Sequence, residues 1–212
     1  MSYVITIGSE KGGVGKSTLT MCIAGELRRR GRQVLVLDMD APQHSLARLR
    51  AAAGDALPAV MPLTGDVAEF QSDADFVLID CPGRRSSVLR SALLQANLLL
   101  IPVAASSFEI WAVEPLRAQA EQVQRELRRP LDVRVLVNRW SSRRARLNDA
   151  LDEYLAAAKL PCLRTRVRDS VGFPSSLAEN RLPSGSSART AAADVAAVTT
   201  EIERLARKGG RK

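Results

Sequence analysis

Residues 8–20 read Gly-Ser-Glu-Lys-Gly-Gly-Val-Gly-Lys-Ser-Thr-Leu-Thr, which has the composition and spacing of a phosphate-binding loop. Glycines let backbone amides turn toward phosphate oxygens, and a helix N-terminus after the loop adds a positive dipole. Lys16 can reach the outer phosphates, and Ser17 can ligate Mg²⁺. The alternative is a glycine-rich turn that binds nothing. We predict that phosphates are held by Gly12, Gly13, Val14, Gly15, Lys16, Ser17 and Thr18.

One position of this loop departs from the general GxxxxGK[ST] pattern. Glu10 stands six residues before Lys16, where the pattern has a glycine, and Lys11 follows it directly. Lysine is uncommon in this chain, since most of its 31 basic residues are arginines. A compact ammonium group suits a phosphate cradle better than a planar guanidinium does, so both lysines are predicted to serve the chemistry of the loop.

Three aspartates follow predicted strands and are candidates for metal and water chemistry. Asp38 and Asp40 follow the apolar run 33–37, and Asp80 ends the run 76–80. Ligands of open α/β sheets bind outside the carboxyl ends of strands. We expect Asp80 to hold Mg²⁺ through water together with Ser17, Asp38 to support the outer shell of the metal or the loop, and Asp40 to orient the attacking water. Helix capping is the alternative for either of the first two aspartates.

Asn138 ends a later predicted strand, where related nucleotide hydrolases contact the purine base. A guanine-reading Asn-Lys-x-Asp motif would place aspartate at position 141, and Ser141 stands there instead. The sequence therefore favours ATP over GTP. A turn-forming role for Asn138 is the alternative.

Strands and helices alternate along the chain, which predicts a mainly parallel sheet with right-handed crossovers. We expect one α/β domain over residues 1–207, a doubly wound sheet with helices on both faces, and a flexible basic tail over 208–212. Predicted strands are 3–7, 33–37, a short one near 59–61, 76–80, 98–103, 133–138 and 162–167. Predicted helices are 19–27, 45–53, 86–95, 108–128, 143–158 and 187–207.

Composition indicates a soluble protein of a reducing cytoplasm. Its three cysteines, Cys22, Cys81 and Cys162, show no metal or redox spacing, and no apolar run approaches the roughly 18 residues of a membrane span. The formal net charge is +8 and is uneven, because residues 139–212 contain 15 basic and 8 acidic side chains against 16 and 15 in residues 1–138. This asymmetry favours a polyanion partner, first of all nucleic acid, although charge that only confers solubility is the alternative.

Arginines of the last third are the predicted contacts to DNA phosphates. Such contacts are independent of base sequence and sensitive to salt. The candidates are Arg143, Arg144, Arg146, Arg189, Arg204, Arg207 and Lys208.

The sequence resembles the ParA/MinD family of deviant Walker A ATPases. The resemblance rests on residues 11–18, on Asp38-Met39-Asp40, on Val77-Leu78-Ile79-Asp80 and on Ile101-Pro102-Val103. It implies a homodimer that forms around ATP and Mg²⁺, in which Lys11 reaches the phosphates of the other subunit. Together with Lys16 and Asp40, Lys11 would then be part of the catalytic set.

Among these proteins, the chain is most similar to small plasmid-partition ATPases without an N-terminal DNA-binding domain. The resemblance implies non-specific binding of double-stranded DNA by the ATP dimer, association with the nucleoid, and a centromere-binding ParB-like partner that stimulates hydrolysis. Two features depart from the family: Glu109 stands where relatives often have an aspartate, and Ala41 stands between Asp40 and the Pro42-Gln43 pair. Counting from the phosphate loop keeps Asp40 in the catalytic register, whereas counting back from Pro42 would put Ala41 there.

Other functions share some of these motifs. A related ATPase that positions another cargo, such as chemoreceptor clusters or microcompartments, has all of them. A MinD-like division-site ATPase would need a C-terminal amphipathic anchor, and the alanine-rich residues 191–198 offer little to embed in a membrane. An iron–sulfur carrier would need paired cysteines, and a DNA-binding module with an inactive nucleotide site would not turn over ATP.

Overall fold

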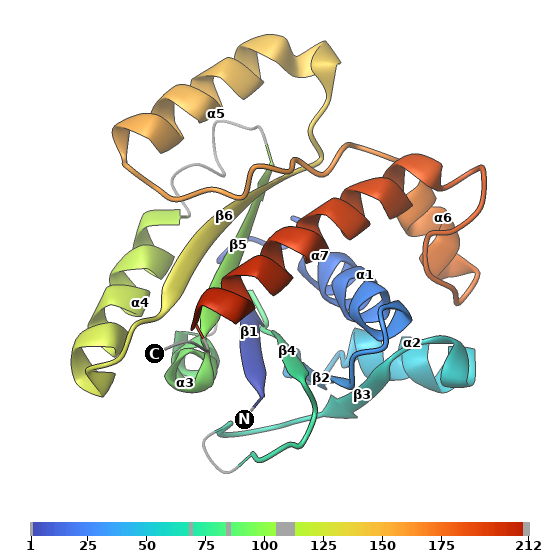
Figure 1. Cartoon of the computed structure of the whole chain (residues 1–212), viewed down its shortest axis with the longest axis horizontal. Coiled ribbons are helices and arrows are strands. Elements are labelled where there is room, and N and C mark those ends of the chain that lie inside the picture. Colours follow the sequence, from blue (N-terminus) through green and yellow to red (C-terminus); the bar gives the residue numbers. More distant parts are fainter. Residues whose placement is uncertain (1, 68–69, 84–85, 105–112, 210–212) are drawn as a thin grey trace.

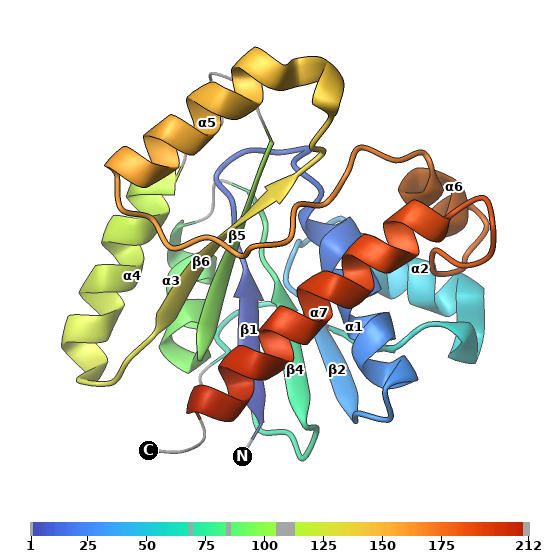
Figure 2. The same cartoon turned by 45° about the horizontal axis from the view of Figure 1, so that its top comes forward.

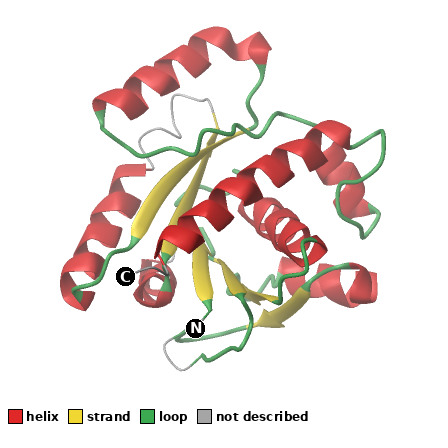
Figure 3. Ribbon diagram, in the orientation of Figure 1, coloured by secondary structure: helices red, strands yellow, loops and turns green. Residues whose placement is uncertain are grey.

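Six parallel strands form one sheet at the centre of the protein (Figures 1 and 3). The computed structural model describes residues 2–67, 70–83, 86–104 and 113–209. The sheet order is β3-β2-β4-β1-β5-β6, so the phosphate-loop strand β1 lies between β4 and β5. The strands are β1 (Tyr3–Ile7), β2 (Val34–Asp38), β3 (Ala59–Pro62), β4 (Phe76–Asp80), β5 (Leu98–Ala104) and β6 (Asp132–Asn138).

Helices cover both faces of the sheet (Figure 2). On one face lie α1 (Lys16–Arg29), α2 (Ser45–Ala53), α6 (Gly172–Ala178) and α7 (Arg189–Gly209). The other face packs against α3 (Ser86–Gln95), α4 (Val113–Leu127) and α5 (Ala145–Ala157). Two short 3₁₀ turns, η1 (Gly54–Ala56) and η3 (Ser142–Arg144), complete the helical elements of the described residues.

The continuous apolar runs of the sequence follow from this two-sided burial. Successive side chains of a strand point to opposite faces, so a strand with helices on both sides has no polar face. In β4, Val77 and Ile79 pack toward α3 and α4, while Phe76 and Leu78 pack toward α1 and α7. The predicted doubly wound parallel sheet is confirmed.

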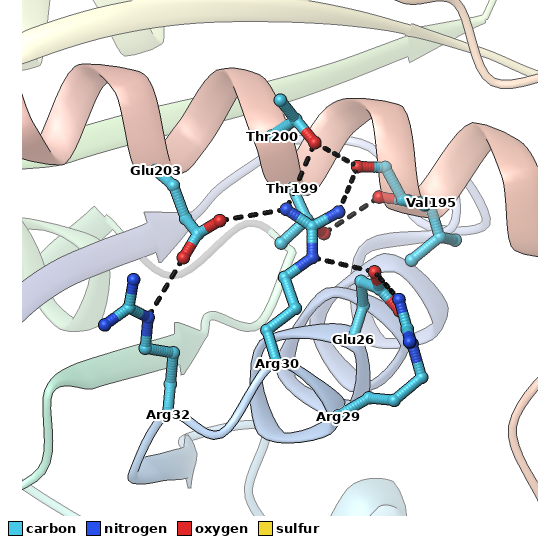
Figure 4. A network of polar contacts seen from close by, with 9 residues as sticks. Glu26, Arg29, Arg30, Arg32, Val195, Thr199, Thr200 and Glu203 are labelled. Carbon is cyan, nitrogen blue, oxygen red and sulfur yellow. Dashed lines mark hydrogen bonds and ion pairs between the residues drawn. The ribbon is translucent and has the colours of Figure 1, made fainter.

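Polar contacts fix α7 to the C-terminal end of α1 (Figure 4). The Arg30 guanidinium donates to Glu203 at 2.9 Å, to the Ala196 carbonyl at 2.7 Å and to Glu26 at 2.8 Å. Arg32 donates to the second oxygen of Glu203 at 3.0 Å. Since α1 starts in the phosphate loop, this network joins that loop to the last helix.

The predicted strand 162–167 is wrong, although the segment does run along the edge of β6. It meets β6 only at intervals: Val135 donates its N–H to the Pro161 carbonyl, and Val167 donates to Val137. Between these points the amides of Arg164 and Thr165 donate instead to the Glu201 carboxylate of α7, at 2.8 and 2.7 Å. Two consecutive backbone amides that donate to a side chain cannot donate to the neighbouring strand, so the segment does not pair continuously with β6.

Helix boundaries differ from the predictions by one to three residues at most ends, and four differences matter for the site or the tail. The first helix already begins at Lys16, and the last one extends past Arg207 to Gly209, which puts Lys208 within the helix. The short helix α6 was not predicted, and residues 142–144 form a 3₁₀ turn ahead of α5. Of the predicted helix 108–128, residues 108–112 lie outside the described part. The strand expected near 59–61 is confirmed as β3.

Candidate functional site

The phosphate loop connects β1 to α1 and turns on glycines with positive φ. Gly15, immediately before the helix, has a φ of 91°. A Cβ at this position would lie 2.7 Å from Nδ2 of Asn138, so backbone conformation and space both require glycine. Nδ2 of Asn138 in turn donates to the Val14 carbonyl at 2.7 Å. The loop is thus held from the end of β6.

Both lysines are part of the loop structure. Nζ of Lys16 donates to the Lys11 carbonyl at 3.2 Å, which folds the loop over the ammonium group. The amide of Lys11 donates to Oγ of Ser9 at 3.2 Å. Gly12 and Gly13 are exposed, and a Cβ on either would meet nothing within 4 Å, so this side of the loop is open to a ligand.

A second segment borders the loop after β4. A Cβ added to Gly83 would lie 3.7 Å from Nζ of Lys16 and 3.7 Å from the Gly12 amide nitrogen. The turn after Asp80 therefore passes close to the place where phosphates would lie. Glycine suits this position because a side chain would project toward the loop.

Asp80 is buried beside the start of α1 and has a free oxygen. Its carboxylate accepts a hydrogen bond from Ser17, and the other oxygen, Oδ1, has no partner among the described residues. Burial, with a smaller contribution from the nearby Asp38 carboxylate, raises the pKa of Asp80 to about 7, against the lowering influence of Ser17. A buried carboxylate oxygen without a donor, next to a serine of a phosphate loop, fits a hydrated Mg²⁺.

Asp38 and Asp40 are not equivalent. Asp38 is fully buried, and its Oδ2 accepts the amides of Leu46 and Ala47 at 2.9 and 3.0 Å, while Oδ1 accepts the Asp40 amide at 3.2 Å. Asp38 therefore holds the first turn of α2 and the loop before it. Asp40 is half-buried, and its charge contributes to raising the pKa of Asp80.

A cavity of about 230 Å³ opens next to the phosphate loop, on the β6 side. Its volume is below the roughly 300–1,000 Å³ of pockets that enclose a whole drug-sized ligand. It therefore suits one part of a ligand whose phosphates lie on the loop. The lining residues are Gly15, Thr18, Leu19, Asn138, Arg139, Arg168, Asp169, Ser170, Val171, Phe173 and Pro174.

The sequence analysis missed the wall formed by Arg168 to Pro174. A signal was present, because residues 162–167 were predicted to be a strand, and residues just beyond the carboxyl end of a strand are candidates for ligand contact. The structure brings this wall to Asn138 through backbone bonds: Trp140 donates to the Val167 carbonyl at 2.9 Å, and Asp169 donates to the Trp140 carbonyl at 2.8 Å.

The predicted DNA-binding residues are all exposed, but they do not form one surface. Arg143, Arg144 and Arg146 lie at the carboxyl edge of the sheet near the cavity, where Arg144 is 3.6 Å from Asp169. The C-terminal end of α7 lies at the opposite edge, because a Cβ on Gly209 would be 3.7 Å from the Tyr3 ring at the start of β1. Figure 2 shows α5 and the end of α7 at opposite ends of the molecule.

These two groups are called here the α5 group and the α7-end group. The α5 group consists of Arg143, Arg144 and Arg146, and the α7-end group consists of Arg204, Arg207 and Lys208. Arg189 belongs to neither, because it starts α7 beside α6.

Among the described residues, no helix combines the length and the apolar composition needed to cross a bilayer.

Known proteins match both the sequence and the fold. The CobQ/CobB/MinD/ParA nucleotide-binding domain family matches residues 5–183. The chain belongs to this family. The predicted ParA/MinD resemblance is thereby confirmed.

Two curated relatives and one solved structure illustrate the range of the family. The maintenance of carboxysome distribution protein A of Halothiobacillus neapolitanus is 26% identical over 212 residues, covering 95% of this chain and 96% of that protein. Protein ParA of Rhizobium radiobacter is 37% identical over 109 residues, covering 47% of this chain and 48% of that protein. Cobyrinic acid a,c-diamide synthase of Mycobacterium smegmatis, solved with a bound ATP analog and magnesium, superposes with a TM-score of 0.75 at 21% identity, covering 100% of this chain and 98% of that one.

Proposed function

We propose that the protein is an ATPase that binds ATP and Mg²⁺ at the phosphate loop and pairs with a second copy while ATP is bound. The pair binds DNA non-specifically and is released from it by partner-stimulated hydrolysis. The observation that supports this most is the geometry around Lys16 and Asp80. A loop with an open glycine face, a lysine folded under it and a buried carboxylate with a free oxygen meets the needs of phosphoryl transfer: held phosphates and a metal position.

Each residue of the site has a task in this proposal. Lys16 and the amides of residues 12–18 bind phosphates, and Ser17 holds Mg²⁺ with Asp80 through a water. When bound, the metal neutralises charge on the β- and γ-phosphates. Asp40 orients the attacking water. Asp38 acts through Asp40, since its buried carboxylate fixes the Asp40 amide.

The cavity beside the loop is the proposed site of the base. Because Nδ2 of Asn138 already donates to Val14, its side-chain oxygen remains as an acceptor. An acceptor there suits the 6-amino group of adenine and disfavours the 6-oxo group of guanine. This agrees with the preference for ATP over GTP that Ser141 suggests.

Lys11 is proposed to act on the partner subunit of the ATP dimer. Its amide donates to Ser9 and its carbonyl accepts from Lys16, and the next two residues, Gly12 and Gly13, are exposed, so Lys11 adjoins the open part of the loop. A second copy that meets this face would bring two Lys11 side chains to two nucleotides.

The proposed role is DNA partition, in which the ATP dimer binds double-stranded DNA and a ParB-like centromere-binding partner stimulates hydrolysis. Support comes from the basic last third and from the likeness to a protein named ParA. A second candidate is the positioning of a protein microcompartment, favoured by the carboxysome-distribution relative, which matches 95% of this chain. The genes beside the coding sequence would separate the two, because a centromere-binding protein points to partition.

Steady-state ATP turnover by the full chain, compared with that of Lys16→Ala and Lys11→Ala, tests the proposal. We expect measurable turnover by the parent and a loss of about a hundredfold or more in both variants, as expected when an electrostatic contact to transferring phosphate is removed. A parent that binds ATP without hydrolysing it would leave a nucleotide-dependent binding module and overturn the ATPase proposal.

Binding to a random duplex in ATP, ADP and no nucleotide, at several salt concentrations, tests the DNA role. Each neutralised phosphate releases counterions, so the affinity of the ATP form should fall steeply with salt. Equal affinity in ATP and ADP, or an affinity independent of salt, would contradict it.

A further inference from the structure

Arg168, a residue of the cavity wall, is held by a carboxylate from the last helix. Asp194 of α7 accepts the backbone amide of Arg168 at 2.9 Å and its guanidinium through Nε at 3.1 Å and Nη2 at 2.6 Å. The Asp194 side chain is only 8% exposed. One buried carboxylate thus fixes both the main chain and the side chain at the first residue of the wall.

The contact between Asp194 and Arg168 fixes the position of the cavity wall. The Arg168 guanidinium forks around Asp194, a geometry that orients a planar group more strictly than a single bond does. Backbone bonds to Trp140 hold the neighbours Val167 and Asp169 against the end of β6. The wall is therefore fixed on one side by the sheet and on the other by α7.

A second carboxylate of α7 anchors the same segment outside the cavity. Glu201 accepts the amides of Arg164 and Thr165, four and three residues before Arg168, and neither lines the cavity. Two turns of helix separate Glu201 from Asp194. The chain thus offers two anchors of similar chemistry, only one of which contacts the wall.

We propose that Asp194 is a positioning residue for the nucleoside, which sets the cavity wall through Arg168 and thereby couples nucleotide occupancy to α7. This inference rests on the proposed placement of the base in the cavity. Coupling between two sites is reciprocal, so a nucleoside that orders the wall also stabilises α7 against local opening. Since α7 also grips the C-terminal end of α1 through Glu203 and Arg30, both parts of the nucleotide site are tied to this helix.

The test compares Asp194→Asn with Glu201→Gln in the full chain, using two probes. MgADP occupies the loop and the cavity, whereas magnesium tripolyphosphate occupies the loop alone. Calorimetry gives the affinity for each probe, and urea unfolding gives stability. Both substitutions remove one anchoring charge from α7, so Glu201→Gln controls for the loss of a helix carboxylate that holds the same segment outside the cavity.

We expect Asp194→Asn to weaken MgADP binding about tenfold, within the range of typical coupling energies, and to leave tripolyphosphate affinity within about twofold. Glu201→Gln should leave both affinities within about twofold, even if it lowers the free energy of unfolding as much as Asp194→Asn does. In the parent, MgADP should slow amide hydrogen exchange of α7 around Asp194 more than tripolyphosphate does, and Asp194→Asn should abolish that difference.

Two further measurements keep the inference testable. Arg168→Lys keeps the stem and the charge but loses the fork, so it should reproduce the loss of MgADP affinity even if Asp194→Asn does not fold. Asp194→Glu keeps a carboxylate at this position and should therefore retain part of the MgADP affinity that Asp194→Asn loses.

Equal MgADP affinity in the parent and Arg168→Lys would overturn the inference, as would a parallel loss for both probes in Asp194→Asn. A parent that binds neither probe would instead refute the proposed nucleotide site.

Discussion

Asp38 and Asp40 are two residues apart in the sequence, but their different surroundings give them different roles. Asp38 is buried and accepts three backbone amides, so its charge is used within the fold. Asp40 is half-buried, and its backbone closes the turn toward His44 while its carboxylate stays near Asp80. The sequence analysis assigned Asp38 to the metal's outer shell or to the loop. The geometry supports the loop.

Replacing each aspartate by alanine should separate these roles. Asp38→Ala leaves three amides without their acceptor, so we expect the free energy of unfolding to fall by about 2–3 kcal/mol. Asp40→Ala should change it by less than about 0.5 kcal/mol, as for most partly exposed positions, and should lower ATP turnover strongly while nucleotide-dependent dimerisation persists. Urea unfolding and turnover on both variants provide the measurements. Normal turnover by Asp40→Ala would show that the register counted from the phosphate loop is wrong.

At the scale of elements, the contact between α1 and α7 combines apolar packing with a charge network centred on the buried Glu203. The Glu203 side chain is 12% exposed and lies between Arg30 and Arg32. Burial by itself raises the pKa of Glu203, but the hydrogen bonds and charges of the two arginines outweigh it and lower that pKa below its ordinary value of 4.5. The ion pairs therefore favour the folded state wherever Glu203 is ionised.

We predict that Glu203→Gln lowers the free energy of unfolding at pH 7 by about 1–3 kcal/mol, the range for hydrogen bonds to charged groups. A folded pKa below the unfolded one gives stability that is present above pH 4.5 and is lost as the pH falls through the folded value. The difference between parent and variant should therefore shrink as the pH of the urea titrations is lowered below 4.5 and through the folded pKa. Glu179→Gln, which removes an exposed pair with Arg181, should change stability by less than about 0.5 kcal/mol at either pH.

The segment 161–169 shows why the local sequence pattern wrongly predicted a strand over residues 162–167. Its apolar Leu163 and Val167 are buried on the sheet, which resembles a strand pattern. Whether the amides between them join a ladder depends on Glu201, which is distant in sequence and reaches them only after α7 has packed. Local propensity contains no information about such a competitor.

At the scale of the whole molecule, the two basic groups lie at opposite ends of the sheet. A straight duplex lying on one end of a single subunit would not reach the other. The α5 group is beside the cavity and at the edge that carries the phosphate loop, where pairing of two subunits around ATP would add a second copy of the same group. Binding that requires ATP should therefore use this end.

We predict that Arg143→Ala, Arg144→Ala and Arg146→Ala together weaken ATP-dependent binding to a random duplex at least tenfold and reduce its salt slope by about two to three for each subunit that contacts the duplex. The matched triple change of Arg204, Arg207 and Lys208 to alanine should alter the affinity less than about threefold. Fluorescence anisotropy across a salt series, with ATP turnover as a control for the site, gives both numbers. The reverse ranking would assign DNA to the α7 end instead.

The sequence by itself determined the phosphate loop, the order of the six strands and of the helices other than α6, the doubly wound parallel sheet and the family. Each of these depends on local spacing or on apolar periodicity. A loop of glycines before Lys16 and a run such as Phe76–Asp80 can be read without knowing what lies opposite them.

Tertiary structure alone decided which residues stand across from each other. It placed Asn138 against Gly15, turned Asp38 toward the start of α2, built a cavity wall from residues 168–174 and fixed that wall with Asp194. It also separated the arginines of the last third into two groups. The physical reason is that these contacts join segments far apart in the chain, whose approach is set by the packing of α1 and α7 on the sheet.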